Sequence, residues 1–123
     1  MSRIVLVTGA SSGFGAAIAR HFAVKGDRLI LTARRIERLE RLRAELESSA
    51  KIHLLQLDVQ DRNAVEKALA GLPAEFADVD ILINNAGLAL GLEPAHRVDL
   101  DDWDTMINTN CKGLTYCTRA LLP

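Results

Sequence analysis

The stretch that most constrains the fold is residues 3–15, RIVLVTGASSGFG, in which an apolar run ends at a glycine-rich turn. Residues 4–7 show no polar alternation, which is typical of a strand covered on both faces in a parallel sheet. Gly9, Gly13 and Gly15 have the spacing that permits a tight turn, close approach of a ligand and close packing of the next helix. Because N–H groups at a helix start bind phosphate, the stretch predicts a strand, a phosphate-binding turn and a helix.

Two other motifs share these glycines. The P-loop pattern needs Lys and then Ser or Thr after its last glycine, and Ala16 follows Gly15, so that motif is excluded. Residues 9–13 also match the nucleophile elbow of serine hydrolases, with Ser11 as the nucleophile. That elbow needs oxyanion-hole donors from an earlier loop, and only eight residues precede Gly9. A hydrolase and a purely structural turn are therefore the weaker alternatives.

Apolar runs alternate with amphipathic stretches along the rest of the chain. Strands are predicted at 29–31, 52–58 and 80–84, and helices at 14–25, 36–47, 61–69 and from Asp99 onward. This alternation predicts an α/β fold, a Rossmann-type doubly wound parallel sheet. Because parallel crossovers are right-handed, the expected strand order is 3-2-1-4, with the switch point between the first and fourth strands.

The helical spacing also predicts which faces are buried. The first helix is expected to bury Phe14, Ala17, Ile18 and Phe22, and the last Trp103, Ile107, Asn110, Leu114, Cys117 and Leu121. Arg38 belongs to the expected solvated face of the second helix. A buried amide needs hydrogen-bond partners, so Asn110 is either satisfied structurally or placed for function.

The end of the second strand predicts the cofactor. An acidic residue there binds the adenosine ribose of NAD, and this chain has Ala33 at that position, followed by Arg34 and Arg35. A guanidinium can hold a 2′-phosphate with two hydrogen bonds, so NADP is favoured over NAD. The alternative is that these arginines only begin a charged helix.

The other strand ends carry further candidates. Asp58 could accept the adenine amino proton while the N–H of Val59 meets a ring nitrogen, although Asp58 could instead cap the next helix. Residues 84–87, Asn-Asn-Ala-Gly, would tie the fourth strand to the first and let the cofactor ribose approach. Of this segment, Asn84 is expected to be structural.

Composition limits the other classes of function. A chain of 123 residues suits one domain, and its net charge of −1 argues against nucleic acid or an anionic membrane as partner. The apolar runs are too short for a membrane span and no signal peptide is recognised, which predicts the cytoplasm. The histidines lack metal-ligand spacing, so no metal site is expected, and Cys111 and Cys117 are expected as free buried thiols.

Four motifs in order and at family spacing, residues 8–15, 58–59, 84–87 and 110–113, resemble the short-chain dehydrogenase/reductase family over essentially the whole chain. Residues 32–35, 72–75 and 85–96 are similar to its NADP-dependent 3-hydroxy acid dehydrogenases. The resemblance implies hydride transfer between NADP and the secondary alcohol or ketone of a small 3-hydroxy acid, and a homotetramer. It assigns cofactor binding to Gly9, Ala10, Ser11, Ser12, Gly13, Phe14, Gly15, Arg34, Arg35, Asp58, Val59, Asn85, Ala86 and Gly87.

The resemblance also assigns Asn110 a catalytic role, holding a water of the proton relay. Phe14 replaces the family's usual Ile and is expected to keep an apolar packing role. The family's catalytic Ser and Tyr-x-x-x-Lys do not occur here, so residues 1–123 are expected to form one NADP-binding domain that stops before the catalytic region and the remaining strands. The alternative is a non-catalytic NADP-binding or sensing module that ends near Pro123.

Hydride transfer in this family requires a positioned acid and base, which these 123 residues lack. We therefore expect the purified 123-residue polypeptide to show no NADP-dependent oxidation of serine or related 3-hydroxy acids, measured by NADPH absorbance. Measurable turnover would contradict this expectation.

Overall fold

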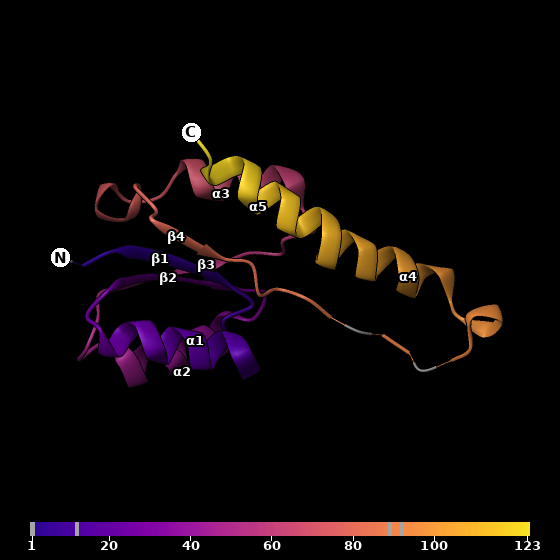
Figure 1. The fold of residues 1–123 in the computed structure, drawn as a ribbon, viewed down its shortest axis with the longest axis horizontal. Helices are drawn as coiled ribbons and strands as arrows, with labels where there is room; N and C mark the ends of the chain where they lie inside the picture. Colours follow the sequence, from indigo (N-terminus) through magenta and orange to yellow (C-terminus); the bar gives the residue numbers. More distant parts are fainter. Residues whose placement is uncertain (1, 12, 89, 92) are drawn as a thin grey trace.

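A computed structural model describes residues 2–11, 13–88, 90–91 and 93–123, which form a parallel sheet with helices on both faces (Figure 1). The strands are β1 (Ile4–Thr8), β2 (Arg28–Ala33), β3 (Ile52–Gln56) and β4 (Ile81–Ile83). Their order is β3-β2-β1-β4 and every pair is parallel. The predicted fold class, strand order and switch point between β1 and β4 are confirmed.

The helices form the two outer layers. Helices α1 (Gly13–Val24) and α2 (Ile36–Leu46) cover one face of the sheet, and α3 (Arg62–Ala70) and α5 (Leu114–Leu121) cover the other (Figure 1). Helix α4 (Leu100–Ile107) continues into α5 through a π-helical segment, η3 (Asn108–Gly113), and this long rod extends beyond the sheet (Figure 1). Two short 3-10 turns, η1 (Ala74–Phe76) and η2 (Ala95–Arg97), lie in the connections.

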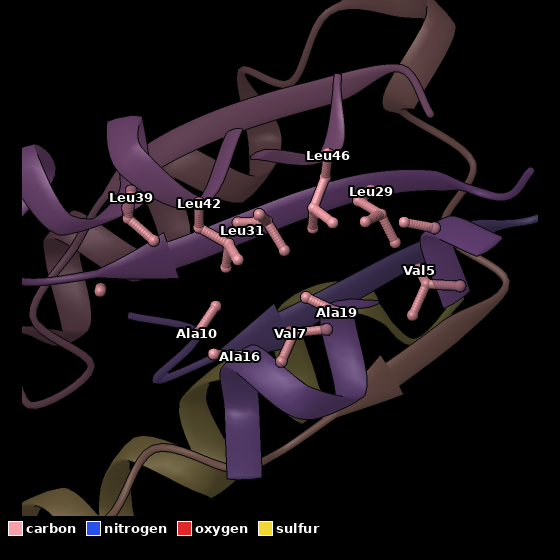
Figure 2. Packing of buried hydrophobic residues seen from close by; sticks show 12 residues of the cluster. Val5, Val7, Ala10, Ala16, Ala19, Leu29, Leu31, Leu39, Leu42 and Leu46 are labelled. Carbon is pink, nitrogen blue, oxygen red and sulfur yellow. The ribbon is translucent and has the colours of Figure 1, made fainter. Parts of the chain in front are cut away.

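The strand side chains alternate between two buried clusters. Val5, Val7 and Leu31 pack against α1 and α2 (Figure 2), whereas Leu6 and Ile30 belong to the cluster on the α3 and α5 side. All five residues of β1 are buried. Burial on both faces explains why the strand sequences show no polar alternation.

The buried side of α1 differs from the predicted stripe. Phe14 is 84% exposed, and the residues that α1 buries are Gly15, Ala16, Ala19 and Ala23. Small side chains let the helix lie close to the sheet, and a large residue on that side would push it away. The expected packing role of Phe14 is therefore wrong, and Ile18 and Phe22 only flank the cluster.

The stripe predicted for the last helix is wrong in part. Trp103, Ile107 and Leu114 are exposed, whereas Cys117 is buried as predicted. The rod also buries Thr109 and Gly113, which the stripe did not include. Helix α4, which carries Trp103 and Ile107, extends beyond the sheet and has no buried residue (Figure 1). The π-helical turn holds more residues than an α-helical turn, so it changes the face that the residues after it, such as Leu114, present. The expected burial of both thiols holds for Cys117 and fails for Cys111, which is exposed.

Strand β4 pairs with β1 along one edge, and within the described ranges no strand pairs with its other edge. Its three residues are only partly buried, unlike those of β1. Also within those ranges, no helix has the length and hydropathy needed to cross a membrane.

Asp27 fixes the start of β2 to the start of β1. The buried carboxylate accepts hydrogen bonds from the Arg3 backbone N–H (3.0 Å) and from Arg3 Nη2 (3.2 Å). The backbone hydrogen bond, helped by the guanidinium, lowers the pKa of Asp27 below its ordinary value. The stabilisation is therefore present above the ordinary pKa of about 3.9 and is lost as the pH falls through the lowered value.

We predict that Asp27→Asn lowers the free energy of unfolding near pH 7 by about 1–2 kcal/mol, because the charge-assisted bonds to Arg3 are lost. The difference from the wild type should shrink as the pH falls below about 4, because the carboxylate of the unfolded wild type is protonated first and that of the folded protein only at lower pH. Thermal unfolding followed by circular dichroism between pH 2.5 and 7 measures both effects. Asp78→Asn, at an exposed position, is the control; a pH-independent difference for Asp27→Asn would contradict the charge argument.

Candidate functional site

A cavity of about 450 Å³ opens at the carboxyl ends of the strands. Its volume is in the range of small-molecule sites, and it lies where ligands bind in open α/β sheets. The cavity is lined by residues from the segments after all the strands and from the π-helical segment: Gly9, Ser11, Phe14, Thr32, Ala33, Arg34, Arg35, Arg38, Leu57, Asp58, Val59, Asn85, Ala86, Gly87, Leu88 and Thr109.

Most of the predicted cofactor residues line this cavity. Those that do are Gly9, Ser11, Phe14, Arg34, Arg35, Asp58, Val59, Asn85, Ala86 and Gly87. Ala10 does not, because it is fully buried and its N–H donates to the Thr32 carbonyl (3.0 Å). Gly13 and Gly15 lie in the adjoining turn and helix start, and the prediction for Ser12 falls outside the described residues.

The glycines of the first turn have different structural roles. A Cβ at Gly15 would lie 2.2 Å from the Gly9 carbonyl oxygen, and one at Gly9 would lie 2.9 Å from the Ala86 Cα atom. These two positions therefore require glycine because the backbone packs on itself. Gly13 has φ +58° and open space on its Cβ side, so its backbone stays accessible to a ligand. An open glycine turn at a helix start fits a phosphate group.

Thr8 and Asn85 join the ends of β1 and β4. The Thr8 hydroxyl oxygen accepts hydrogen bonds from the backbone N–H groups of Asn85 (3.0 Å) and Ala86 (2.9 Å). The Asn85 amide donates from Nδ2 to the Gly9 carbonyl (3.0 Å). Residues 85–87 are thereby held against the first turn, as predicted. The central place of Thr8 was not predicted, although a hydroxyl side chain ending an apolar strand is a signal for it.

Asp58 lies on the cavity wall after β3. Its Oδ1 accepts a hydrogen bond from the Gln60 N–H (3.0 Å) within a local turn. The residue that caps α3 is Asp61, whose Oδ1 accepts from the Ala64 N–H (3.1 Å). The alternative that Asp58 caps the helix is therefore wrong, because the helix begins three residues later than that alternative requires.

Asn110 is exposed rather than buried, so that expectation is corrected. Its Oδ1 accepts from the Leu88 N–H and its Nδ2 donates to the Leu88 carbonyl, both at 2.8 Å. A Cβ at Gly87 would lie 3.2 Å from the same Oδ1. The amide thus fixes the segment after residues 85–87 to the π-helical segment, beside the cavity and outside its lining.

Sequence reasoning missed three polar residues of the lining. Thr32 and Thr109 are buried, and within the described residues their hydroxyl oxygens have no hydrogen-bond partner. Arg38, expected on the solvated face of α2, lines the cavity beside Arg34 and Arg35. Helical side chains lean toward the helix N-terminus, and this rule could have placed Arg38 there.

The polar groups can serve distinct parts of a nucleotide. The positively charged side chains of Arg34, Arg35 and Arg38 can bind a phosphate. Asp58 supplies a carboxylate that can accept hydrogen bonds. No group of three or more His, Cys, Asp or Glu side chains in the described ranges could hold a metal ion. The open turn, the arginines and the unpartnered hydroxyls together fit a phosphorylated dinucleotide.

Comparison with known proteins supports this arrangement. A family model for short chain dehydrogenases matches residues 3–123. The NADP-dependent 3-hydroxy acid dehydrogenase YdfG of Escherichia coli K12 is 57% identical over 120 residues, which are 98% of this chain and 48% of that protein. Serine 3-dehydrogenase of Rhizobium radiobacter is 54% identical over 123 residues, all of this chain and 49% of that protein.

A solved structure gives the same result. The closed form of a serine dehydrogenase complexed with NADP+ superposes with a TM-score of 0.89 at 57% identity, covering 98% of this chain and 48% of that chain. This chain therefore spans about half the length of the relatives that it matches. Because the family model matches nearly every residue and the fold agrees, the protein belongs to the short-chain dehydrogenase family.

Proposed function

We propose that the protein is an NADP-dependent oxidoreductase that transfers a hydride between the nicotinamide and the secondary alcohol or ketone of a small 3-hydroxy acid. The observation that carries the proposal is the arginine-lined end of the cavity. Ala33 ends β2 without a carboxylate, and Arg34 and Arg35 follow it on the cavity wall. Positive charge and no acid at this place suit a 2′-phosphate rather than a free ribose hydroxyl.

The Arg34 backbone is held in place from the neighbouring strand. Gln56, at the end of β3, donates from Nε2 to the Arg34 carbonyl (3.0 Å), and Arg35 has the extended backbone that precedes α2. A backbone that is already fixed loses little further conformational entropy when the side chain binds an anion.

The relatives support the enzyme over the alternative. YdfG and serine 3-dehydrogenase are named as dehydrogenases, which favours an enzyme over a non-catalytic NADP-binding or sensing module. Their names also support a small 3-hydroxy acid as the substrate class. When bound, the nicotinamide would supply the hydride acceptor or donor, and this chain's residues would bind and orient it.

We assign roles to the residues accordingly. The turn from Gly9 to Gly15 would hold the phosphates, Asp58 and Val59 the adenine, and residues 85–87 a ribose. Asn110 would serve the reaction as the residue that holds a water of the proton relay. Its amide now bonds to Leu88, so this role requires a further contact or a local rearrangement.

We also propose a homo-oligomer, a tetramer by family resemblance. The exposed apolar side chains of Leu100, Trp103, Ile107 and Leu114 along α4 and α5 support it, since such patches often mark protein interfaces. The cytoplasm remains the predicted compartment.

The assignment of NADP as the cofactor is tested by measuring the cofactor affinities of Arg34→Ala. We predict that the variant binds NADP about 10- to 100-fold more weakly, because a charge-assisted contact with the 2′-phosphate is lost. Binding of NAD should be unchanged. Fluorescence titration of the protein with both cofactors measures the two affinities.

Arg62→Ala is the matched control, because Arg62 is an exposed arginine of α3 that pairs with Glu66 outside the cavity. It should bind both cofactors as the wild type does. An equal loss of NADP and NAD binding in Arg34→Ala would reject the 2′-phosphate assignment.

A further inference from the structure

We propose that Arg38 is a third specificity-determining residue, binding the 2′-phosphate of the cofactor together with Arg34 and Arg35. This inference rests on the proposed function and adds a residue that the sequence placed on a solvated helix face. Three observations carry it: the position of Arg38 in α2, the cavities that it lines and the lack of an acidic partner in the described part of the chain.

Arg38 is the third residue of α2, and Arg35 is the residue that precedes the helix. Side chains on a helix lean toward its N-terminus, so a long side chain at the third position extends back over the first turn. That direction leads to the end of β2, where Arg34 and Arg35 lie. The cavity lining includes all three arginines, together with Ser11 of the glycine turn.

Arg38 lies between the cofactor cavity and a second hollow. This hollow runs between α1 and α2 and is lined by Ser11, Ala16, Arg20, Arg38, Arg41, Leu42 and Glu45. Ser11 and Arg38 are the two residues that line both it and the cofactor cavity. Arg41, one turn further along α2, lines the second hollow without lining the first.

The one carboxylate of the second hollow is already engaged. Arg20 donates to Glu45 from Nε (2.6 Å) and from Nη2 (3.2 Å), a two-point contact between α1 and α2. Within the described ranges, no carboxylate lies within ion-pair distance of Arg38. Its exposed guanidinium therefore keeps its hydrogen-bonding capacity for a ligand.

The start of α2 is positively charged in the free protein. No side chain caps the helix at Arg35, and Glu37 is the acidic residue of the first turn. Arginines near a helix N-terminus are unfavourable, because the helix dipole is positive there. A phosphate monoester carries close to two negative charges and reverses this balance. The cluster thus favours a ligand with a phosphate at this end over one with a hydroxyl.

The experiment compares Arg38→Ala with Arg41→Ala, which removes the same charge from the same helix one turn away. Affinities for NADP, NAD, 2′,5′-ADP and 5′-AMP are measured by calorimetry with the protein. Arg38→Ala should bind NADP and 2′,5′-ADP about tenfold more weakly. It should bind NAD and 5′-AMP as the wild type does, and Arg41→Ala should change each affinity less than twofold.

The conservative variant and the melting temperature separate binding from folding. Arg38→Lys should recover part of the NADP affinity, because it restores the charge without the two-point geometry. The melting temperature of free Arg38→Ala should equal or exceed that of the wild type at low salt, since repulsion at the helix start is relieved.

Three results overturn the inference. The first is an unchanged NADP affinity in Arg38→Ala. The second is an equal loss in Arg38→Ala and Arg41→Ala, which indicates only a general effect of positive charge. The third is a parallel loss of NADP and NAD binding with a lower melting temperature. Failure of the proposed function gives a different pattern. In that case the wild type itself shows no preference for NADP over NAD or for 2′,5′-ADP over 5′-AMP.

Discussion

The close contact between the start of α1 and the turn after β1 is the constraint on which the rest of the structure depends. A Cβ at Gly15 would lie 2.2 Å from the Gly9 carbonyl oxygen and 2.6 Å from the Asn85 amide nitrogen, so no larger residue fits without moving backbone. The same amide donates to the Gly9 carbonyl. One small region therefore sets the angle of α1, the shape of the turn and the distance from β1 to the segment after β4.

That region also explains why the cavity opens where it does. Strands β2 and β3 lie to one side of β1 and β4 lies to the other, so the connections diverge at this point. Thr8 keeps the two sides together by accepting two backbone N–H groups from beyond β4. A ligand that spans the divergence meets the arginines after β2, the carboxylate after β3 and the amides after β4 on a scaffold that is already assembled.

The sequence predicted what depends on backbone rules and missed what depends on how helices pack. Unbroken apolar runs identified the strands, and right-handed crossovers then determined their order. The buried faces of two helices were wrong in part, for separate reasons: α1 approaches through Ala16 and Ala19 rather than through Phe14, and α4, which carries Trp103 and Ile107, extends beyond the sheet. Helical spacing in the sequence reveals neither fact, because both depend on where the helix lies relative to the sheet.

Among the site residues, too, those near strand ends were predicted and those on helices were missed. Residues within two positions of a strand end, such as Arg34, Asp58 and Asn85, were predicted from position alone, since the ends of parallel strands meet at one edge. Thr109 and Arg38 lie within helical segments, where sequence spacing shows a face and not the neighbour that the face meets. Thr109 could be placed only once the packing of Gly113 on Val59 was known, where a Cβ would lie 2.5 Å from a Val59 methyl carbon.

The distribution of charge completes the argument about selectivity. The chain as a whole has a net charge of −1, which gives no sign of an anionic ligand. Electrostatic interactions in physiological salt are screened over about 8 Å, so a bound phosphate responds to the groups that line its own cavity. Arg34, Arg35 and Arg38 all line that cavity, and Glu45, which lines the adjoining hollow, is held by Arg20. The proposed preference for a 2′-phosphate therefore rests on the charges at the start of α2 and not on the net charge of the chain.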